Sequence, residues 1–205
     1  MDPAHWDARY AGPDRVWSAE PNPFVVETFS GLPPGAALDL GTGEGRHATW
    51  FASRGWTVTA VDFSAEAIRK ARALQAAHAA ETLGRVEWVR ADVVAEPPRP
   101  RAYDAVAVMY LHLAAPQRRQ ALRGAAEALA PGGTLLVVGH DSANLAQGVG
   151  GPQDPAVLFT AEDVVADLAG PSGPALRVVR AERGMRPVGD DGAAALDAVV
   201  VARRA

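Results

Sequence analysis

Short apolar runs alternate with helical patterns along most of this chain. Five runs have the length and β-branched content of buried strands: residues 36–40, 57–61, 86–90, 104–109 and 134–138. Between them, apolar side chains recur at the spacing of a helix stripe, in residues 46–54, in residues 64–78 behind an N-capping Ser64, and after Pro116. This alternation predicts a doubly wound α/β fold, in which helices cover both faces of a mostly parallel sheet.

The C-terminal part departs from the alternation. Residues 175–182 and 196–202 are strand candidates with no helix between them, and the Gly/Asp-rich residues 184–193 join them. They predict an antiparallel hairpin at one edge of the sheet, which makes the sheet seven-stranded and Rossmann-like. At 205 residues, the chain is expected to form one domain over residues 1–205.

Two segments lie outside the strand and helix patterns. Residues 1–34 contain several aromatic side chains and a short helical pattern opened by Pro23, and we expect an N-terminal lid and helix there. Residues 139–159 form a long connection before a helix that Thr160 and Asp163 would cap. Because a loop of this length in a compact domain is usually functional, we expect a substrate loop, with a plain surface loop as the alternative.

Composition narrows the classes of function. The formal net charge is -4 and the 20 basic residues are scattered, whereas duplex-binding proteins concentrate theirs, so no nucleic-acid partner is expected. The absence of cysteine excludes disulfides, thiolate metal sites and cysteine nucleophiles. No signal peptide, membrane span of ~20 apolar residues or clustered metal-ligand spacing is evident. We therefore expect a cytoplasmic protein without a metal, whose oligomeric state stays open.

A glycine loop, Gly41-Thr42-Gly43-Glu44-Gly45, follows the first predicted strand. Glycines let the chain turn sharply from strand to helix and let a ligand touch the backbone. Residues 43–48 also match the dinucleotide fingerprint. The loop alone is therefore compatible with more than one cofactor, and with a tight turn that binds nothing.

Three carboxylates accompany three successive strands. Asp39 lies inside an apolar strand end, where an unpaired charge is costly, so it should orient the loop or meet a cationic ligand. Asp62 ends the next strand, 21 positions after Gly41, where a carboxylate can accept both ribose hydroxyls. Asp92 follows the third strand, where it could receive an adenine amino group. Each residue alone suits a cap or turn, but the three together favour a nucleoside ligand.

Five segments in order resemble the class I S-adenosylmethionine-dependent methyltransferases. They read LDLGTGEGRHA at 38–48, VTAVDFS at 58–64, VEWVRADV at 86–93, YDAVAVMYLHL at 103–113 and LAPGGTLLVVGHD at 129–141. In size and in the GEGRHA form of the loop, the chain is most similar to small methyltransferases of the tellurite-resistance and thiopurine type. The resemblance implies an enzyme that takes S-adenosyl-L-methionine, methylates a small molecule and releases S-adenosyl-L-homocysteine.

The resemblance also implies which residues hold the cofactor. The set is Trp17, Asp39, Gly41, Thr42, Gly43, Gly45, Arg46, Asp62, Phe63, Ser64, Asp92, Val93 and Met109. The glycine loop and Asp39 would cradle the methionine half, and Met109 would present its backbone to the amino-acid end. Asp62 would hold the ribose, while the adenine would lie between Phe63 and the segment of Asp92 and Val93. Trp17 would either cover the cofactor or anchor the N-terminal helix.

Four residues after the fourth and fifth strands are candidates for catalysis: Tyr110, His112, His140 and Asp141. In-line attack on the methyl carbon depends largely on alignment and on excluding water, and it needs a base only for an acceptor that arrives protonated. The adjacent His140 and Asp141 are the leading base and carboxylate, unless they bond to loop backbone.

Two other functions stay open. One is a non-catalytic module that only binds S-adenosylmethionine, and the other is an NAD-dependent oxidoreductase that uses the same glycine loop. The second explains neither Asp39 nor Asp92, and no group of residues suited to hydride transfer is evident.

Overall fold

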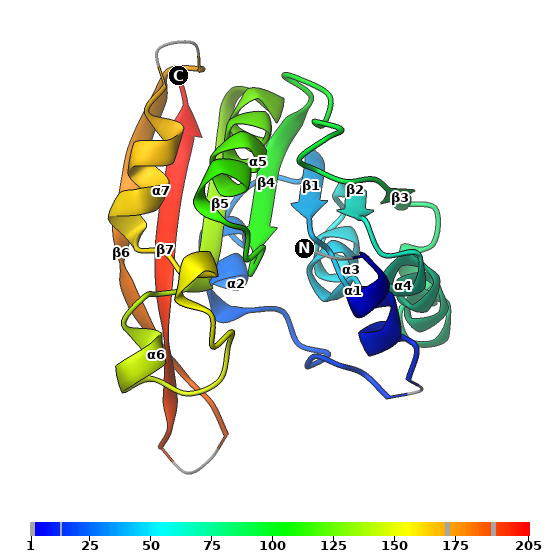
Figure 1. Cartoon of the computed structure of the whole chain (residues 1–205). Helices are drawn as coiled ribbons and strands as arrows, with labels where there is room; N and C mark the ends of the chain where they lie inside the picture. Colours follow the sequence, from blue (N-terminus) through cyan, green and yellow to red (C-terminus); the bar gives the residue numbers. More distant parts are fainter. Residues whose placement is uncertain (1–2, 13, 171–172, 190–191) are drawn as a thin grey trace.

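A single mixed sheet organises the computed structural model, which describes residues 3–12, 14–170, 173–189 and 192–205 (Figure 1). The strands within these ranges are β1 (Ala36–Leu40), β2 (Thr57–Asp62), β3 (Val86–Arg90), β4 (Tyr103–Met109), β5 (Leu129–His140), β6 (Leu176–Pro187) and β7 (Ala194–Arg204). They lie in the order β3-β2-β1-β4-β5-β7-β6. The first five pair in parallel, whereas β7 is antiparallel to both β5 and β6. The predicted seven-stranded sheet with an antiparallel C-terminal edge is confirmed.

Helices cover both faces of this sheet (Figure 1). The helical elements are α1 (Pro3–Tyr10), α2 (Pro23–Phe29), α3 (Arg46–Ser53), α4 (Ala65–His78), η1 (Ala80–Thr82), α5 (Ala115–Ala128), α6 (Asn144–Gln147), η2 (Pro155–Val157) and α7 (Ala161–Leu168). None of those in the described ranges combines the length and apolarity needed to cross a membrane.

The core consists of two layers, because neighbouring strand residues point to opposite faces of the sheet. Val106 and Val108 of β4 pack in the layer that contains Leu122 of α5 and Val164 of α7. Ala105 and Ala107 of the same strand belong to the opposite layer, with the aromatic side chains of α2 and α3. β1 and β4 are buried over most of their length on both faces, which explains why their sequences are mostly apolar without alternation.

Local capping agrees with the predicted helix boundaries. Oγ of Ser64 accepts a hydrogen bond from the backbone N of Ala67 at 3.0 Å and so begins α4. Thr160 and Asp163 form a reciprocal capping box at the start of α7. These two helices begin where their side-chain chemistry predicts.

The connection predicted over residues 139–159 proves shorter and more ordered. Gly139 and His140 belong to β5, because the antiparallel ladder with β7 continues to the pair His140 and Asp197. The remainder contains α6 and η2. This extension of β5 carries His140 to the end of the sheet beside Asp197.

Candidate active site

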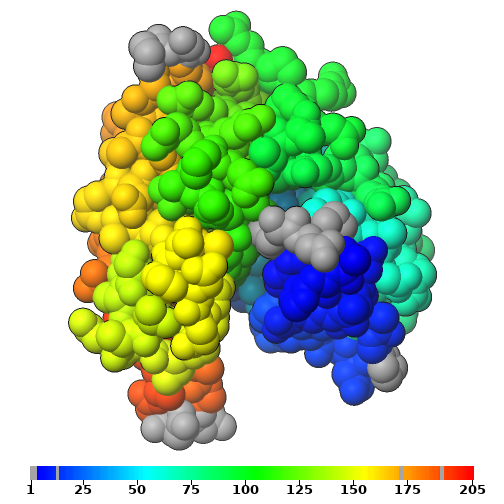
Figure 2. All heavy atoms as spheres, in the orientation of Figure 1, coloured from blue at the N-terminus to red at the C-terminus, as the bar shows by residue number. Residues whose placement is uncertain are grey.

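A cavity of about 930 Å³ opens beyond the carboxyl ends of the parallel strands. The chain order reverses between β1 and β4, and ligands of open α/β sheets bind at such a switch point. In Figure 2 a cleft separates the N-terminal segment, in blue, from the segment near residues 150–160, in yellow. The volume lies in the range of small-molecule and cofactor sites, which is roughly 300–1,000 Å³.

Two groups of side chains line opposite parts of this cavity. We call the first the glycine-loop half, and it comprises Trp17, Gly41, Thr42, Gly43, Arg46, Asp62, Phe63, Asp92, Val93 and Met109. We call the second the histidine half, and it comprises Tyr110, His112, His140, Arg186 and the loop residues Val149, Gly150, Gly151 and Pro152. Most of the predicted cofactor residues therefore meet around one space.

The glycine loop has a backbone conformation that requires glycine. Gly41, Gly43 and Gly45 have φ angles of 71°, 55° and 79°, in the left-handed region that side chains disfavour. A Cβ atom on Gly45 would lie 2.3 Å from the Trp88 ring, so this glycine also allows α3 to approach the sheet. The backbone N atoms of Gly41 and Thr42 donate to the carbonyl of Val61, which joins the loop to β2.

Asp39 orients this loop from behind rather than from within the cavity. Its carboxylate is completely buried, and its Oδ2 accepts hydrogen bonds from Thr42 Oγ1 at 2.6 Å and from the backbone N of Ala48 at 3.2 Å. Oδ1 has no partner in the described part of the chain, and burial raises the pKa of Asp39 to about 6. The prediction that Asp39 contacts the cofactor is therefore corrected, whereas its orienting role agrees with the structure.

Two further residues of the predicted cofactor set lie outside the lining. Gly45 is covered by Trp88, as its close approach shows. Ser64 caps α4 and donates its hydroxyl to Oδ1 of Asp7 in α1. Both support the wall of the cavity without facing it.

Asp62 both fixes the loop and faces the cavity. Its Oδ2 accepts a hydrogen bond from the backbone N of Gly43 at 2.8 Å, and its Oδ1 accepts one from the backbone N of Ser64 at 2.9 Å. Burial raises the pKa of this carboxyl. Since each carboxylate oxygen can accept more than one hydrogen bond, Asp62 retains acceptor capacity toward a ligand.

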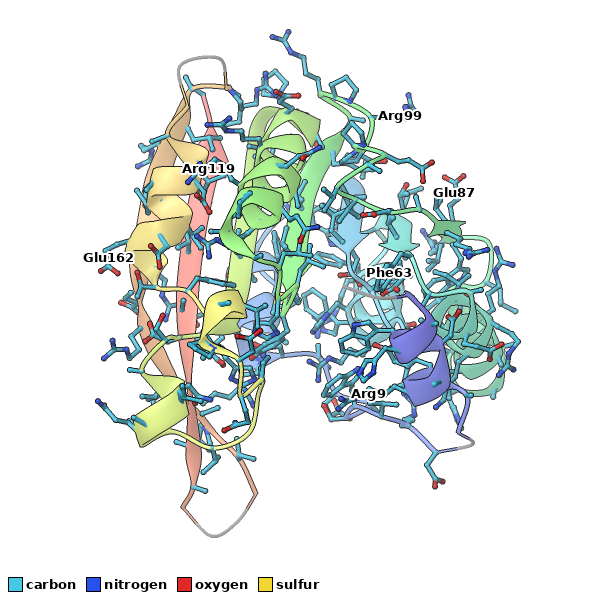
Figure 3. All side chains as sticks on the ribbon, in the orientation of Figure 1. Arg9, Phe63, Glu87, Arg99, Arg119 and Glu162 are labelled. Atoms are coloured by element: carbon cyan, nitrogen blue, oxygen red, sulfur yellow. The ribbon has the colours of Figure 1, made fainter. Side chains whose placement is uncertain are left out.

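The N-terminal segment covers the glycine-loop half. Figure 3 labels Phe63, which follows β2, and Arg9 of α1, and both line the cavity. Trp17 also lines it, donating from Nε1 to the Tyr10 hydroxyl at 3.1 Å, and the Arg9 guanidinium lies 5.0 Å from its ring. Trp17 is 40% exposed, so it covers the cavity rather than anchoring a core.

A buried ion pair that we did not predict holds this cover in place. Glu44 of the glycine loop accepts hydrogen bonds from the backbone N atoms of Val16 and Trp17, at 2.9 and 3.0 Å. The Lys70 ammonium lies 2.9 Å from the Glu44 carboxylate and also donates to the carbonyls of Gly12 and Asp14. The one feature of the sequence that could have pointed to this ion pair is that Lys70 is the only lysine of the chain.

A hydrogen-bond network fixes Tyr110 in the histidine half. Its hydroxyl donates to Oδ2 of Asp197 at 2.8 Å and accepts from Asn22 Nδ2 and Arg186 Nε, at 2.8 and 2.9 Å. Burial raises the pKa of this phenol far above neutral pH. Tyr110 is therefore a poor base, and its part in the site is to join the N-terminal segment to the C-terminal hairpin.

The two predicted histidines stack against each other. Their ring centroids lie 5.4 Å apart at an interplanar angle of 12°. His112 Nε2 accepts a hydrogen bond from the backbone N of His140 at 3.1 Å, and burial lowers the pKa of His112 to about 3. His112 thus stays neutral and positions the end of β5.

His140 pairs with a carboxylate other than the predicted one. Its Nδ1 lies 3.4 Å from Oδ1 of Asp197, and neither atom forms a hydrogen bond within the described residues. Asp141 instead accepts hydrogen bonds from Arg183 Nε and from the backbone N of Ala143, both at 2.9 Å, and lies outside the cavity lining. The structure therefore places Asp197, and not Asp141, beside His140, because β7 puts Asp197 opposite His140 while the chain carries Asp141 beyond the strand. Asp141 bonds loop backbone, which was the alternative that the sequence left open.

Asn22, Arg186 and Asp197 are site residues that the sequence analysis missed. Asp197 lies in an apolar strand and is completely buried, as Asp39 is. A lone carboxylate in an apolar strand needs a partner, so Asp197 is as recognisable from the sequence as Asp39. Asn22 and Arg186 carry no such signal, because each reaches the site through tertiary contacts.

The predicted substrate loop lies against His140. A Cβ atom on Gly151 would lie 2.6 Å from Cδ2 of the His140 ring, whereas one on Gly150 would meet nothing within 4 Å. Among the described residues, no group of three or more His, Asp or Glu side chains could hold a metal ion.

Comparisons with known proteins agree with this geometry. Residues 37–133 match the family model described as a methyltransferase domain. A ubiquinone biosynthesis O-methyltransferase of Xanthomonas campestris pv. campestris (strain B100) is 33% identical over 135 residues, which cover 64% of this chain and 54% of that protein. The chain thus spans about half the length of the curated relatives it matches.

Solved structures share the fold over nearly the whole chain. The 1,6-didemethyltoxoflavin-N1-methyltransferase of Burkholderia thailandensis, with bound 1,6-didemethyltoxoflavin and S-adenosylhomocysteine, has a TM-score of 0.69 at 22% identity and covers 98% of this chain and 86% of that one. TehB of Haemophilus influenzae has a TM-score of 0.68 at 17% identity and covers 99% of this chain and 67% of that one. The match over residues 37–133 and the shared fold agree with the resemblance to class I S-adenosylmethionine-dependent methyltransferases that the motifs indicated.

Proposed function

We propose that this protein binds S-adenosylmethionine in the glycine-loop half of the cavity and transfers its methyl group to a small molecule in the histidine half. The observation that carries the proposal is that both halves belong to one cavity of about 930 Å³. Such a space accommodates a nucleoside cofactor together with a small acceptor. A macromolecular acceptor would instead need an open surface beside the methyl group.

The residues of the glycine-loop half fit this cofactor. Asp62 retains acceptor capacity for ribose hydroxyls, and Phe63 offers an apolar face beside it for the adenine. The glycines leave the loop backbone open to the ligand, since they carry no side chain. Arg46 lines the same half and can complement a carboxylate such as that of the cofactor's amino-acid end.

Catalysis in such a site consists mainly of alignment and protection. When bound, the sulfonium cofactor supplies an electrophilic methyl group for in-line displacement. The chain's own residues hold the two reactants in one orientation and, through the N-terminal segment and the Gly150–Gly151 loop, exclude water. The names of the relatives, one an O-methyltransferase and one an N1-methyltransferase, support a small acceptor without deciding the acceptor atom.

Isothermal titration with S-adenosylmethionine, S-adenosylhomocysteine and NAD tests the cofactor. We expect both sulfur ligands to bind and NAD not to bind. Binding of NAD alone would overturn the proposal in favour of an oxidoreductase. Transfer of label from methyl-labelled S-adenosylmethionine to a panel of small acceptors then distinguishes an enzyme from a module that only binds the cofactor.

A further inference from the structure

The carboxylate of Asp197 bridges two groups that face the histidine half. Its Oδ2 accepts a hydrogen bond from Arg186 Nε at 2.7 Å, and its Oδ1 lies 3.4 Å from His140 Nδ1. Asp197 is completely buried, so it has few other ways to satisfy its charge. One fixed carboxylate therefore sets the positions of both a guanidinium and an imidazole at the cavity.

Arg186 keeps part of its donor capacity for a ligand. A guanidinium has five N–H donors, and the contacts in the described part of the chain use only the Nε of Arg186. The side chain is 22% exposed and lines the cavity. Its two terminal amino groups are thus available to an oxygen that carries negative charge, while their positive charge disfavours a cationic amine.

His140 is the remaining candidate for a base. Tyr110 is held by its three hydrogen bonds, and His112 uses Nε2 to accept the backbone N–H of His140. Nδ1 of His140 lies 3.4 Å from Oδ1 of Asp197 without a hydrogen bond, and the other ring nitrogen, Nε2, has no hydrogen-bond partner in the described residues, so Nε2 can accept a proton. Burial lowers the pKa of His140, which keeps the ring neutral and able to act as a base at neutral pH.

We propose that the methyl acceptor is a small molecule with an acidic hydroxyl group, a phenol or an enol, whose oxygen is held by Arg186 and deprotonated by His140. This inference rests on the proposed function. The hydroxyl proton moves to His140 Nε2, the oxygen forms the new bond to the methyl carbon, and the carbon–sulfur bond breaks with its electrons left on sulfur. The products are a methyl ether and S-adenosylhomocysteine, and His140 then releases its proton to water. Asp197 is the positioning residue for both side chains.

A binding experiment tests the acceptor class without methyl transfer. The protein is saturated with S-adenosylhomocysteine and titrated with 4-nitrophenol, whose visible absorption band belongs to the phenolate. We expect the wild type to bind it as the phenolate, R186Q to bind it at least about tenfold more weakly, and R186K to recover part of the loss. A wild type that binds S-adenosylhomocysteine but not 4-nitrophenolate, or an R186Q variant that binds it equally well, overturns the inference. Failure to bind S-adenosylhomocysteine overturns the proposed function instead.

The second test measures methyl transfer at steady state and compares D197N with a control variant at the residue next to His140. D197N keeps the volume of the side chain but removes its charge, and we expect kcat to fall by about 100-fold, with a rise in the acceptor KM because Arg186 loses its carboxylate partner. D141N makes the same change next to His140 at a residue paired with Arg183, and it should retain wild-type turnover. Thermal unfolding of each variant verifies that it is folded. Methylation of thiophenol or aniline in place of phenol, or full kcat in D197N, contradicts the assignment.

Discussion

The two halves of the cavity are built in different ways. The glycine-loop half consists of a short backbone turn after β1 and of residues that directly follow β2 and β3. The histidine half joins side chains that are far apart in sequence, since Asn22 and Tyr110 alone are separated by 88 positions. One half is thus specified by local sequence, whereas the other depends on how the whole sheet is assembled.

The electrostatics of the two halves differ as well. Next to the glycine-loop half, the charge of Glu44 is matched by Lys70, and within that half Asp62 accepts hydrogen bonds from backbone N–H groups. In the histidine half, Asp197 is shared among a phenol, a guanidinium and an imidazole. The first arrangement is suited to binding the proposed cofactor in a fixed position. The second is suited to polarising the reacting group of the proposed methyl acceptor.

Loss of Lys70 should have the largest effect on the glycine-loop half. K70A leaves the Glu44 carboxylate buried without its partner, and breaking such a pair costs about 3 kcal/mol or more. We expect urea unfolding to show this loss, and affinity for S-adenosylmethionine to fall because residues 14–17 are released. R69A is the matched control: the neighbouring Arg69 forms an exposed pair with Glu66, worth about 1 kcal/mol at most. Equal losses in the two variants would show that the buried pair does not hold the cover.

Asp62 is the next strongest test, and it compares two carboxylates of the same half. D62A removes the proposed contact with the ribose and also the acceptor that fixes Gly43, so we expect the Kd for S-adenosylmethionine to rise by about 100-fold. D92A should raise it less than about tenfold, because Asp92 is exposed and its Oδ1 accepts the backbone N–H of Val94. Isothermal titration measures both. A larger effect at Asp92 than at Asp62 would reverse the roles assigned to them.

The same contrast explains how much of the molecule could be predicted from its sequence. Strand and helix positions followed from apolar periodicity and caps, and β1 and β3 have the predicted bounds. The glycine loop and Asp62 were recognisable because their chemistry is local. Asp39, Gly45 and Ser64 were expected to contact the cofactor, but they do not line the cavity. A sequence motif indicates which residues lie near a ligand, and it does not distinguish those that face the ligand from those that support the residues facing it.

The pairing of His140 failed for a different reason. Adjacent residues in a sequence are an attractive pair, but the partner of a strand residue lies across the sheet. Asp197 faces His140 only because β7 inserts between β5 and β6 with that register. Register of this kind is a property of the assembled sheet, and no local pattern in residues 139–141 contains it.

Asp39 offers a pH-dependent test of the glycine-loop half. Its pKa of about 6 in the folded protein lies above its ordinary value of 3.8, so the folded state holds the proton more tightly than the unfolded chain. The stabilisation from this group is complete below pH 3.8 and is lost as pH rises through about 6, by on the order of 3 kcal/mol. D39N cannot titrate, so the difference in unfolding free energy between it and the wild type should change by that amount between pH 4 and 7. A constant difference would mean that Asp39 is not desolvated in the folded protein.

The smallest effect concerns the contact between the predicted substrate loop and the histidine half. Gly150 and Gly151 have φ angles of 71° and 79°, so alanine at either position introduces similar backbone strain. Only at Gly151 would the new Cβ collide with the His140 ring, at 2.6 Å from its Cδ2. We expect G151A to lower kcat/KM for the acceptor by about tenfold relative to G150A, since a small displacement of a base is costly. The affinity of both variants for S-adenosylmethionine should match that of the wild type, because neither glycine belongs to the glycine-loop half. If the two variants lose activity equally, backbone strain alone accounts for the loss, and the loop does not act through His140.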